Sequence, residues 1–185
     1  MNRYVEVLSA SLATFAATNI DDAFLLTFFF ARRIPPRRII VGQYIGFAII
    51  VVAGLVCSWA ALAISDRWIR FLGLLPIALG IKHLFHKPRM ESGQQSTEDF
   101  SVLSIALLTM SNGADNIGVY VPFFIVGRNS LWLILVVYAL LVGVWCFVGR
   151  WLGTRSVLLR LVDRWADRAV PIILISLGAY VFYSA

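Results

Sequence analysis

Six apolar segments follow one another along the sequence, separated by short polar connections. A helix that crosses a bilayer needs about 20 mostly apolar residues, and about 17 can suffice. The third and sixth segments are the shortest, and each contains a proline. The pattern predicts an all-α integral membrane protein with six transmembrane helices, at residues 5–31, 39–64, 69–85, 101–127, 131–152 and 169–183.

Three carboxylates interrupt this apolar pattern. Asp21 and Asp22 lie in the middle of the first segment, and Asp115 lies in the middle of the fourth. An ionised Asp at the centre of a transmembrane helix costs roughly 2.5–3.5 kcal/mol, so three cost about 8–10 kcal/mol. Such residues point first to an ion or proton site, and second to polar contacts that hold helices together.

The composition supports the membrane assignment. Hydrophobic residues make up 60% of the chain, charged residues only 14%, and the mean hydropathy is +0.83. A soluble domain has about a quarter of its residues charged. A chain of 185 residues then has room for a single membrane domain and not for a soluble catalytic module as well. Cys57 and Cys146 both fall inside predicted spans, so we expect neither a disulfide nor a zinc finger.

The basic residues are distributed unevenly. The connections after the first, third and fifth segments, counted together with Lys82 and Arg150 at the ends of the adjoining segments, hold 12 of the 16 Lys and Arg residues. The positive-inside rule therefore places these connections in the cytoplasm and both termini outside it. The net charge of +6 reflects this topology, and we expect a lipid bilayer and no nucleic acid as partner. Residues 150–168 interleave five arginines with apolar residues, as an amphipathic helix on an anionic leaflet would.

The two halves of the sequence resemble one another. A shift of 94 residues places Asp21 on Asp115, Asp22 on Asn116 and Tyr44 on Tyr138, and a shift of 98 places Leu79-Gly80 on Leu177-Gly178. Each half has three segments, so the two copies would insert with opposite orientation. We expect two inverted three-helix repeats, at residues 1–87 and 101–185, joined by a cytoplasmic linker at 88–100, with a binding site at their interface.

Polar side chains surround the carboxylates in both segments. Thr18 and Asp22 are four residues apart and Asn19 and Asp22 three, so they share a helical face. Asp21 points about 100° away from Asp22 unless the helix is distorted. The first segment therefore offers a carboxylate, an amide and a hydroxyl on one side.

The fourth segment repeats this pattern with Asn112, Asp115 and Asn116. Gly113 weakens the helix there, and Pro122 removes one backbone hydrogen bond. Unwound backbone at that depth would add carbonyl oxygens to the donor set. Oxygen donors with two or three carboxylates match a divalent cation, and interhelical hydrogen bonding is the alternative.

Two motifs carry a family resemblance. The stretches Ala17 to Asp22 (ATNIDD) and Ser111 to Pro122 (SNGADNIGVYVP) resemble those of the bacterial cadmium resistance transporter family, within the lysine-exporter superfamily. The resemblance covers nearly the whole chain. It implies export of a divalent heavy-metal ion such as Cd²⁺ across the bacterial inner membrane. It would make Asp21, Asp22, Asp115 and Asn116 the ion-binding residues.

The identity of the ion stays open at this point. Cd²⁺ favours thiolate, whereas the motif residues are oxygen donors. Cys57 or Cys146 could add sulfur, or the physiological ion could be a harder one such as Zn²⁺, Mn²⁺ or Mg²⁺. Gly42 and Gly46 form a GxxxG motif, which marks a close helix crossing either within the chain or in a homodimer.

Three other functions compete with ion export. Asp22 and Asp115 could form the dyad of an intramembrane aspartyl protease, although Gly113-Ala114-Asp115 lacks the Gly-x-Gly-Asp pattern of that class. Amino-acid export would follow from the parent superfamily, and a passive channel is the third. The sequence has no phosphate-binding GxxxxGK[ST] motif. We therefore expect a secondary transporter with no cofactor, in which protons are the coupling ion.

Overall fold

The computed structural model describes residues 3–32, 34–62, 71–72, 74–85, 100–153 and 172–183, and helices dominate this part of the chain. The predicted linker at 88–99 and the basic segment at 154–168 lie outside the described residues. The helices are α1 (Arg3–Thr18), α2 (Ile20–Ala31), α3 (Pro36–Leu62), α5 (Leu74–Phe85), α6 (Val102–Asn112), α7 (Asn116–Val126), the short 3₁₀ helix η1 (Arg128–Ser130), α8 (Leu131–Leu152) and a C-terminal helix, Ile172–Tyr183.

Among the described residues, two helices are long and apolar enough to cross a membrane. They are Pro36–Leu62 and Arg128–Leu152. A third span results if the bent pair Tyr4–Thr18 and Ile20–Ala31 counts as one. The other apolar helices are shorter, so the all-α fold predicted from the sequence is confirmed, whereas the six-span arrangement stays a prediction.

The first predicted span is not one straight helix. It breaks at Asn19, where the backbone leaves the helical conformation (φ −119°, ψ 20°), and α1 and α2 meet at 57°. The side chain of Asn19 donates back to the carbonyl of Phe15 at 2.9 Å, and Trp145 Nε1 of α8 donates to the carbonyl of Asn19. These contacts add to the backbone hydrogen bonds of Asn19 with Phe15 and Ala23, at 3.0 and 3.4 Å, and fix the bend from the last turn of α1 and from a distant helix.

The fourth predicted span also breaks, at Gly113-Ala114-Asp115 between α6 and α7. The amide of Gly113 donates to the carbonyl of Thr109 at 2.9 Å and closes α6. The weak point predicted at Gly113 is therefore confirmed. Pro122, by contrast, lies inside α7, which continues to Val126 without interruption.

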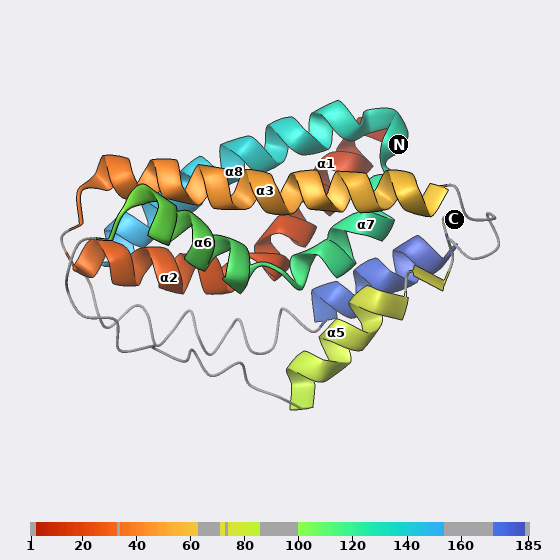
Figure 1. Ribbon diagram of the computed structural model, residues 1–185. Coiled ribbons are helices and arrows are strands. Elements are labelled where there is room, and N and C mark those ends of the chain that lie inside the picture. The colour runs from red at the N-terminus through yellow and green to blue at the C-terminus, as the bar shows by residue number, and fades with distance from the viewer. Residues whose placement is uncertain are drawn as a thin grey trace.

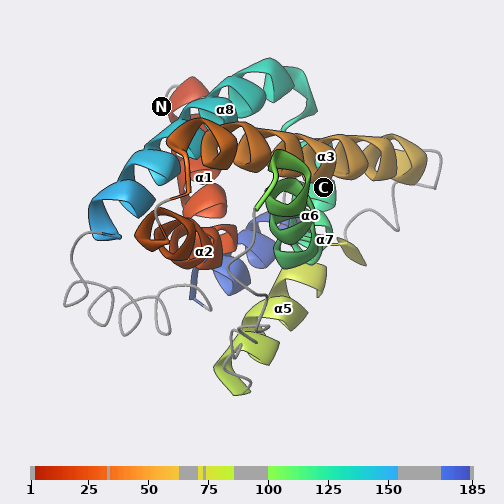
Figure 2. The ribbon, with the colours of Figure 1, turned by 60° about the vertical axis from the view of Figure 1, so that its left-hand side comes forward.

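Glycine allows α3 and α6 to pack closely, and the same is true of α8 and α2. A Cβ at Gly42 would lie 2.7 Å from the Ile105 side chain, and one at Gly46 would lie 2.6 Å from the Ala106 carbonyl. Figures 1 and 2 both show α6 directly beneath α3. A Cβ at Gly149 of α8 would likewise lie 2.6 Å from Leu26 Cβ of α2. The Gly42/Gly46 motif therefore serves a contact within the chain, and it no longer argues for a homodimer.

The packing is inverted relative to a soluble protein. Many large apolar side chains are exposed, among them Trp59, Trp132, Leu140 and Phe147. Eleven described polar side chains are buried instead: Ser11, Thr14, Thr18, Asn19, Asp22, Thr27, Gln43, Ser58, Thr109, Asn116 and Ser130. An apolar exterior around polar interior groups is the distribution expected of a bundle that sits in lipid.

Candidate cation site

Asp22 is the buried carboxylate at the centre of the bundle, with a side chain only 1% exposed. Gln43 Nε2 of α3 donates to Asp22 Oδ2 at 2.8 Å, and Asn112 Nδ2 of α6 donates to Asp22 Oδ1 at 2.9 Å. Both carboxylate oxygens thus accept a hydrogen bond, each from a different helix. The hydrogen bond from Asn112 thus links Asp22 to the fourth predicted segment.

Gln43 is held in one orientation by a further hydrogen bond. Thr109 Oγ1 donates to Gln43 Oε1 at 2.7 Å, so the amide nitrogen of Gln43 must face Asp22. Gln43, Thr109 and Asn112 then form a continuous polar layer between α3 and α6. Sequence analysis missed Gln43, although it is a lone amide in an apolar segment and stands beside the Gly42/Gly46 motif.

The helix breaks place backbone dipoles around Asp22. The residue lies in the first turn of α2, where unpaired N–H groups make the helix end positive and favour a carboxylate. Asn112 is the last residue of α6, whose C-terminal carbonyls form a negative end. Two broken helices therefore meet at the same buried carboxylate.

Asp21 and Asp115 lie around this carboxylate without sharing its hydrogen bonds. Asp21 is half-buried, and its Oδ1 accepts from the backbone N–H of Asp22 at 3.0 Å. Asp115 is exposed at the position before α7. It interacts electrostatically with both Asp21 and Asp22, so the three carboxylates share one electrostatic environment.

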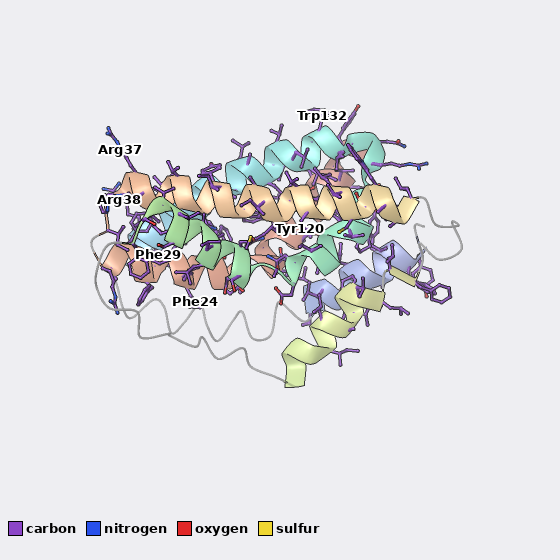
Figure 3. The ribbon with its side chains drawn as sticks, viewed as in Figure 1. Phe24, Phe29, Arg37, Arg38, Tyr120 and Trp132 are labelled. Atoms are coloured by element: carbon purple, nitrogen blue, oxygen red, sulfur yellow. The ribbon has the colours of Figure 1, made fainter. Side chains whose placement is uncertain are left out.

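Thr18 and Asn19 face a different partner from the one predicted. Asn19 Nδ2 donates to Tyr120 OH at 2.8 Å, and Thr18 Oγ1 lies 3.1 Å from the same hydroxyl. Tyr120 is fully buried in α7, in the middle of the bundle in Figure 3. These two residues therefore join a second polar cluster next to Asp22, and Tyr120 is a member that sequence analysis quoted only as part of a motif.

Asn116 is buried in the first turn of α7, and its amide nitrogen packs against the Gly113 turn. Its backbone N–H donates to the carbonyl of Gly113 at 3.1 Å. No described side-chain hydrogen bond links it to Asp22. The seven predicted ligands thus fall into four groups. Asp22 and Asn112 form the centre, and Asp21 and Asp115 lie around them. Thr18 and Asn19 contact Tyr120, and Asn116 packs at the Gly113 turn.

The described residues contain no group of three or more His, Cys, Asp and Glu side chains placed so that they could hold a metal ion together. The donors around Asp22 are neutral amides, which leave its negative charge uncompensated. A cation bound at this carboxylate would supply the missing charge, with oxygen ligands of the kind that hard and borderline divalent ions accept.

The sequence is similar to a known protein family. A family model described as cadmium resistance transporter matches residues 15–185, nearly the whole chain. No curated protein and no solved structure matches the sequence. The match begins at Phe15, so it includes both helix breaks and every predicted site residue.

Proposed function

We infer that this chain, which belongs to the cadmium resistance transporter family, exports a divalent cation from the cytoplasm in exchange for protons. One observation supports this most directly. Asp22 is buried at the meeting point of two helix breaks, and its hydrogen-bond partners are neutral. A membrane protein that needed only a stable bundle would avoid this carboxylate, because its burial has a high cost.

Binding would recruit the neighbouring carboxylates to Asp22. Asp21 and Asp115 add charge in the same electrostatic environment, and two or three carboxylates suit a divalent ion better than a monovalent one. The amide oxygens of Asn112, Asn116 and Asn19 are the neutral ligands that we propose to complete the shell. Cd²⁺ follows from the family, and Zn²⁺ from the oxygen donors.

An inverted repeat is our proposal for the architecture, and two features of the helices support it. Helices α1 and α6 end at Thr18 and Asn112, 94 residues apart, and each is followed by a break and a second short helix, α2 and α7. Each long helix also packs on the broken helix of the other half, α3 on α6 and α7, and α8 on α1 and α2. Rocking of such halves about a shared site would give alternating access.

Protons are the proposed coupling ion. Moving a divalent cation outward against 100 mV costs about 4.6 kcal/mol, and two inward protons per exported cation would make the cycle electroneutral. Carboxylates bind either a metal or protons, and the two compete. The same residues can therefore couple the two fluxes without a nucleotide.

An intramembrane aspartyl protease gains no support from the described geometry. Asp22 accepts hydrogen bonds from Gln43 and Asn112, and Asp115 is exposed. Among the described residues, no hydrogen bond joins the two carboxylates, whereas a protease dyad shares one proton between them. Amino-acid export is the alternative that a transport assay must test.

We also propose that both termini lie outside the cytoplasm. Arg37 and Arg38 lie at one end of the bundle, whereas Trp132 and the two chain ends lie toward the other end (Figures 1 and 3). A cysteine at position 94 should be shielded from an impermeant thiol reagent on intact cells, and one added after Ala185 should react. The opposite labelling pattern would overturn this topology.

The decisive assay is uptake into inverted vesicles with separate Cd²⁺, Zn²⁺, Mn²⁺, Mg²⁺ and lysine. We expect Cd²⁺ and Zn²⁺ uptake with proton movement in the opposite direction. Metal flux that ignores a pH gradient would refute the proton coupling. Lysine uptake without metal uptake would make the protein an amino-acid exporter.

A further inference from the structure

We propose that a row of buried hydroxyl groups along α1, bridged by internal water, is the path by which protons reach Asp22 from the N-terminal end of the bundle. This inference rests on the proposed proton exchange. It assigns a role to Ser11, Thr14 and Tyr138, which the cation site does not use, and it begins at a cleft where α1 starts.

The row runs down one face of α1. Ser11, Thr14 and Thr18 are spaced by three and four residues, so they lie above one another on α1. Asp22 follows four residues later, past the break at Asn19, and all four side chains are buried. Thr18 Oγ1 donates to the carbonyl of Thr14 at 2.9 Å, and Ser11 Oγ donates to the carbonyl of Val7 at 2.7 Å. Ser11 Oγ therefore keeps lone pairs that can accept a hydrogen bond from water, whereas Thr18 Oγ1 already accepts from Asn19 Nδ2 at 2.8 Å.

Among the described residues, three buried polar atoms lack a hydrogen-bond partner: Thr14 Oγ1 within this row, Asn19 Oδ1 just after it and Tyr138 OH of α8. A buried polar group without a partner is unfavourable, so partners are expected, and internal water is the usual one. The rings of Tyr138 and Tyr120 are 5.2 Å apart, and Tyr120 OH accepts from Asn19. The unpaired atoms thus flank the Thr18–Asn19–Tyr120 cluster, one helical turn from Asp22.

The outer end of the row adjoins a cleft of about 100 Å³, which has room for several water molecules. Its lining includes Glu6, Val7 and Ala10 of α1, and Ser130 and Tyr180 from the far half of the chain. Ser11 bonds the carbonyl of Val7, a lining residue, so the row starts at the wall of the cleft. Glu6 would give the entrance a carboxylate that attracts protons.

The row of hydroxyl groups lies on only one side of Asp22, which gives the proposed proton path a direction. Beyond Asp22, the buried side chains of α2 are mainly apolar: Ala23, Leu26 and Phe29. Thr27 is the exception, and its hydroxyl is already paired with the carbonyl of Ala23 at 2.6 Å. Water can therefore follow α1 from the cleft to Asp22, whereas beyond Asp22 the buried Thr27, Gln43 and Thr109 side chains are already hydrogen-bonded within the protein. The proposed topology places the cleft outside, where the protons start.

Proton transfer along the row conserves all atoms. Each water or hydroxyl accepts one proton and releases another to its neighbour, as in proton relays within other membrane bundles. The last transfer leaves Asp22 neutral when the cation departs. No step needs an oxidant, a reductant or a nucleotide.

The test compares two modes of transport in proteoliposomes. Thr14→Val and Tyr138→Phe each remove one unpaired hydroxyl with little change in volume. We expect the double variant to reduce Cd²⁺ flux driven by a pH gradient by about tenfold, as loss of a bridging hydrogen bond suggests. Exchange of Cd²⁺ for Cd²⁺ at equal pH, which needs no proton path, should stay within about twofold of the unsubstituted protein.

Thr27→Val is the matched control, because it removes a buried Thr hydroxyl on the other side of Asp22. It should leave the ratio of the two transport modes unchanged. Equal loss of both modes in the double variant would overturn the inference and make these residues structural. So would full gradient-driven flux together with higher thermal stability, since the atoms would then be merely unpaired. If the unsubstituted protein shows metal exchange without any gradient-driven flux, the proton coupling of the proposed function itself fails.

Discussion

Asn112 donates a hydrogen bond to Asp22 at 2.9 Å across 90 residues of chain. Asp22 lies in the first turn of α2 and Asn112 is the last residue of α6, so a single contact joins the two places where the helices break. Because the donor is neutral, the contact orients the carboxylate without neutralising it. Substitutions of these two residues, and of the groups that hold the contact in place, therefore test the proposed cation site.

Asp22→Asn should reduce divalent cation transport by about a hundredfold or more, because a buried charge that pairs with the cation disappears. The new amide nitrogen would also face the donors of Gln43 or Asn112. Insertion should persist, and stability in detergent should be equal or higher, since the cost of burying a charge is removed. Metal uptake by vesicles and thermal unfolding of the purified variant measure the two effects.

Asp115→Asn should also abolish transport if this exposed carboxylate completes the cation site. Glu98→Gln, in the predicted linker, is the matched carboxylate control and should transport normally. Normal transport by both Asp variants would place the cation site elsewhere. Failure of both to fold would favour a structural role for the carboxylates.

Gln43→Met should weaken both the fold and the cation site. The change keeps the length of the side chain but leaves Thr109 Oγ1 without its acceptor and Asp22 Oδ2 without its donor. We expect a loss of about 1–3 kcal/mol in unfolding free energy. A double-mutant cycle with Thr109→Val should give less than the sum of the single effects, because both changes break the same hydrogen bond. Additive effects would show that the two side chains act independently.

Gly46→Ala should separate α3 from α6. The added Cβ would lie 2.6 Å from the Ala106 carbonyl and 2.7 Å from Thr109 Cβ. Overpacking of this kind costs about 1–3 kcal/mol, and the shift would move Asn112 away from Asp22, so metal flux should fall with stability. Gly118→Ala is the control, because its Cβ would meet only Leu79 Cδ1, at an ordinary 3.5 Å. An unfolding midpoint equal for both variants would contradict the close crossing.

The two thiols should contribute unequally to Cd²⁺ transport. Cys57 is exposed on α3, whereas Cys146 is buried in α8 and interacts electrostatically with Asp22. We expect Cys57→Ser to be neutral, and the double variant with Cys146→Ser to keep at least part of the Cd²⁺ flux, because the proposed ligands are oxygens. Competition between Cd²⁺ and Zn²⁺ measures the remaining selectivity. Complete loss of Cd²⁺ flux with Zn²⁺ flux retained would move the Cd²⁺ ligand to sulfur.

From the sequence, it was easier to predict which polar residues lie close together than to predict the hydrogen-bond partner of each. Asp22 and Asn112 could be assigned to one site because intramembrane carboxylates are few, although the repeat aligns Asp22 with Asn116 and not with Asn112. The break at Gly113 was predictable from glycine. The break at Asn19 was not, because no Gly or Pro stands there and its backbone is held by Trp145, 126 residues away. Gln43 was missed because a lone amide does not show which side of a helix faces inward, although its place beside Gly42 and Gly46 gave a clue.

Synthesis from the N-terminus gives the long separation of Asp22 and Asn112 a further consequence. When α1, α2 and α3 have entered the bilayer, Gln43 is already present, but the donor for the second oxygen of Asp22 has not yet been made. The groove at Gly42 and Gly46 likewise lacks α6 to fill it. The half-made protein therefore holds an incompletely paired carboxylate and an open glycine groove side by side, and the arrival of α6 closes both at once. Biogenesis and function thus depend on the same contact.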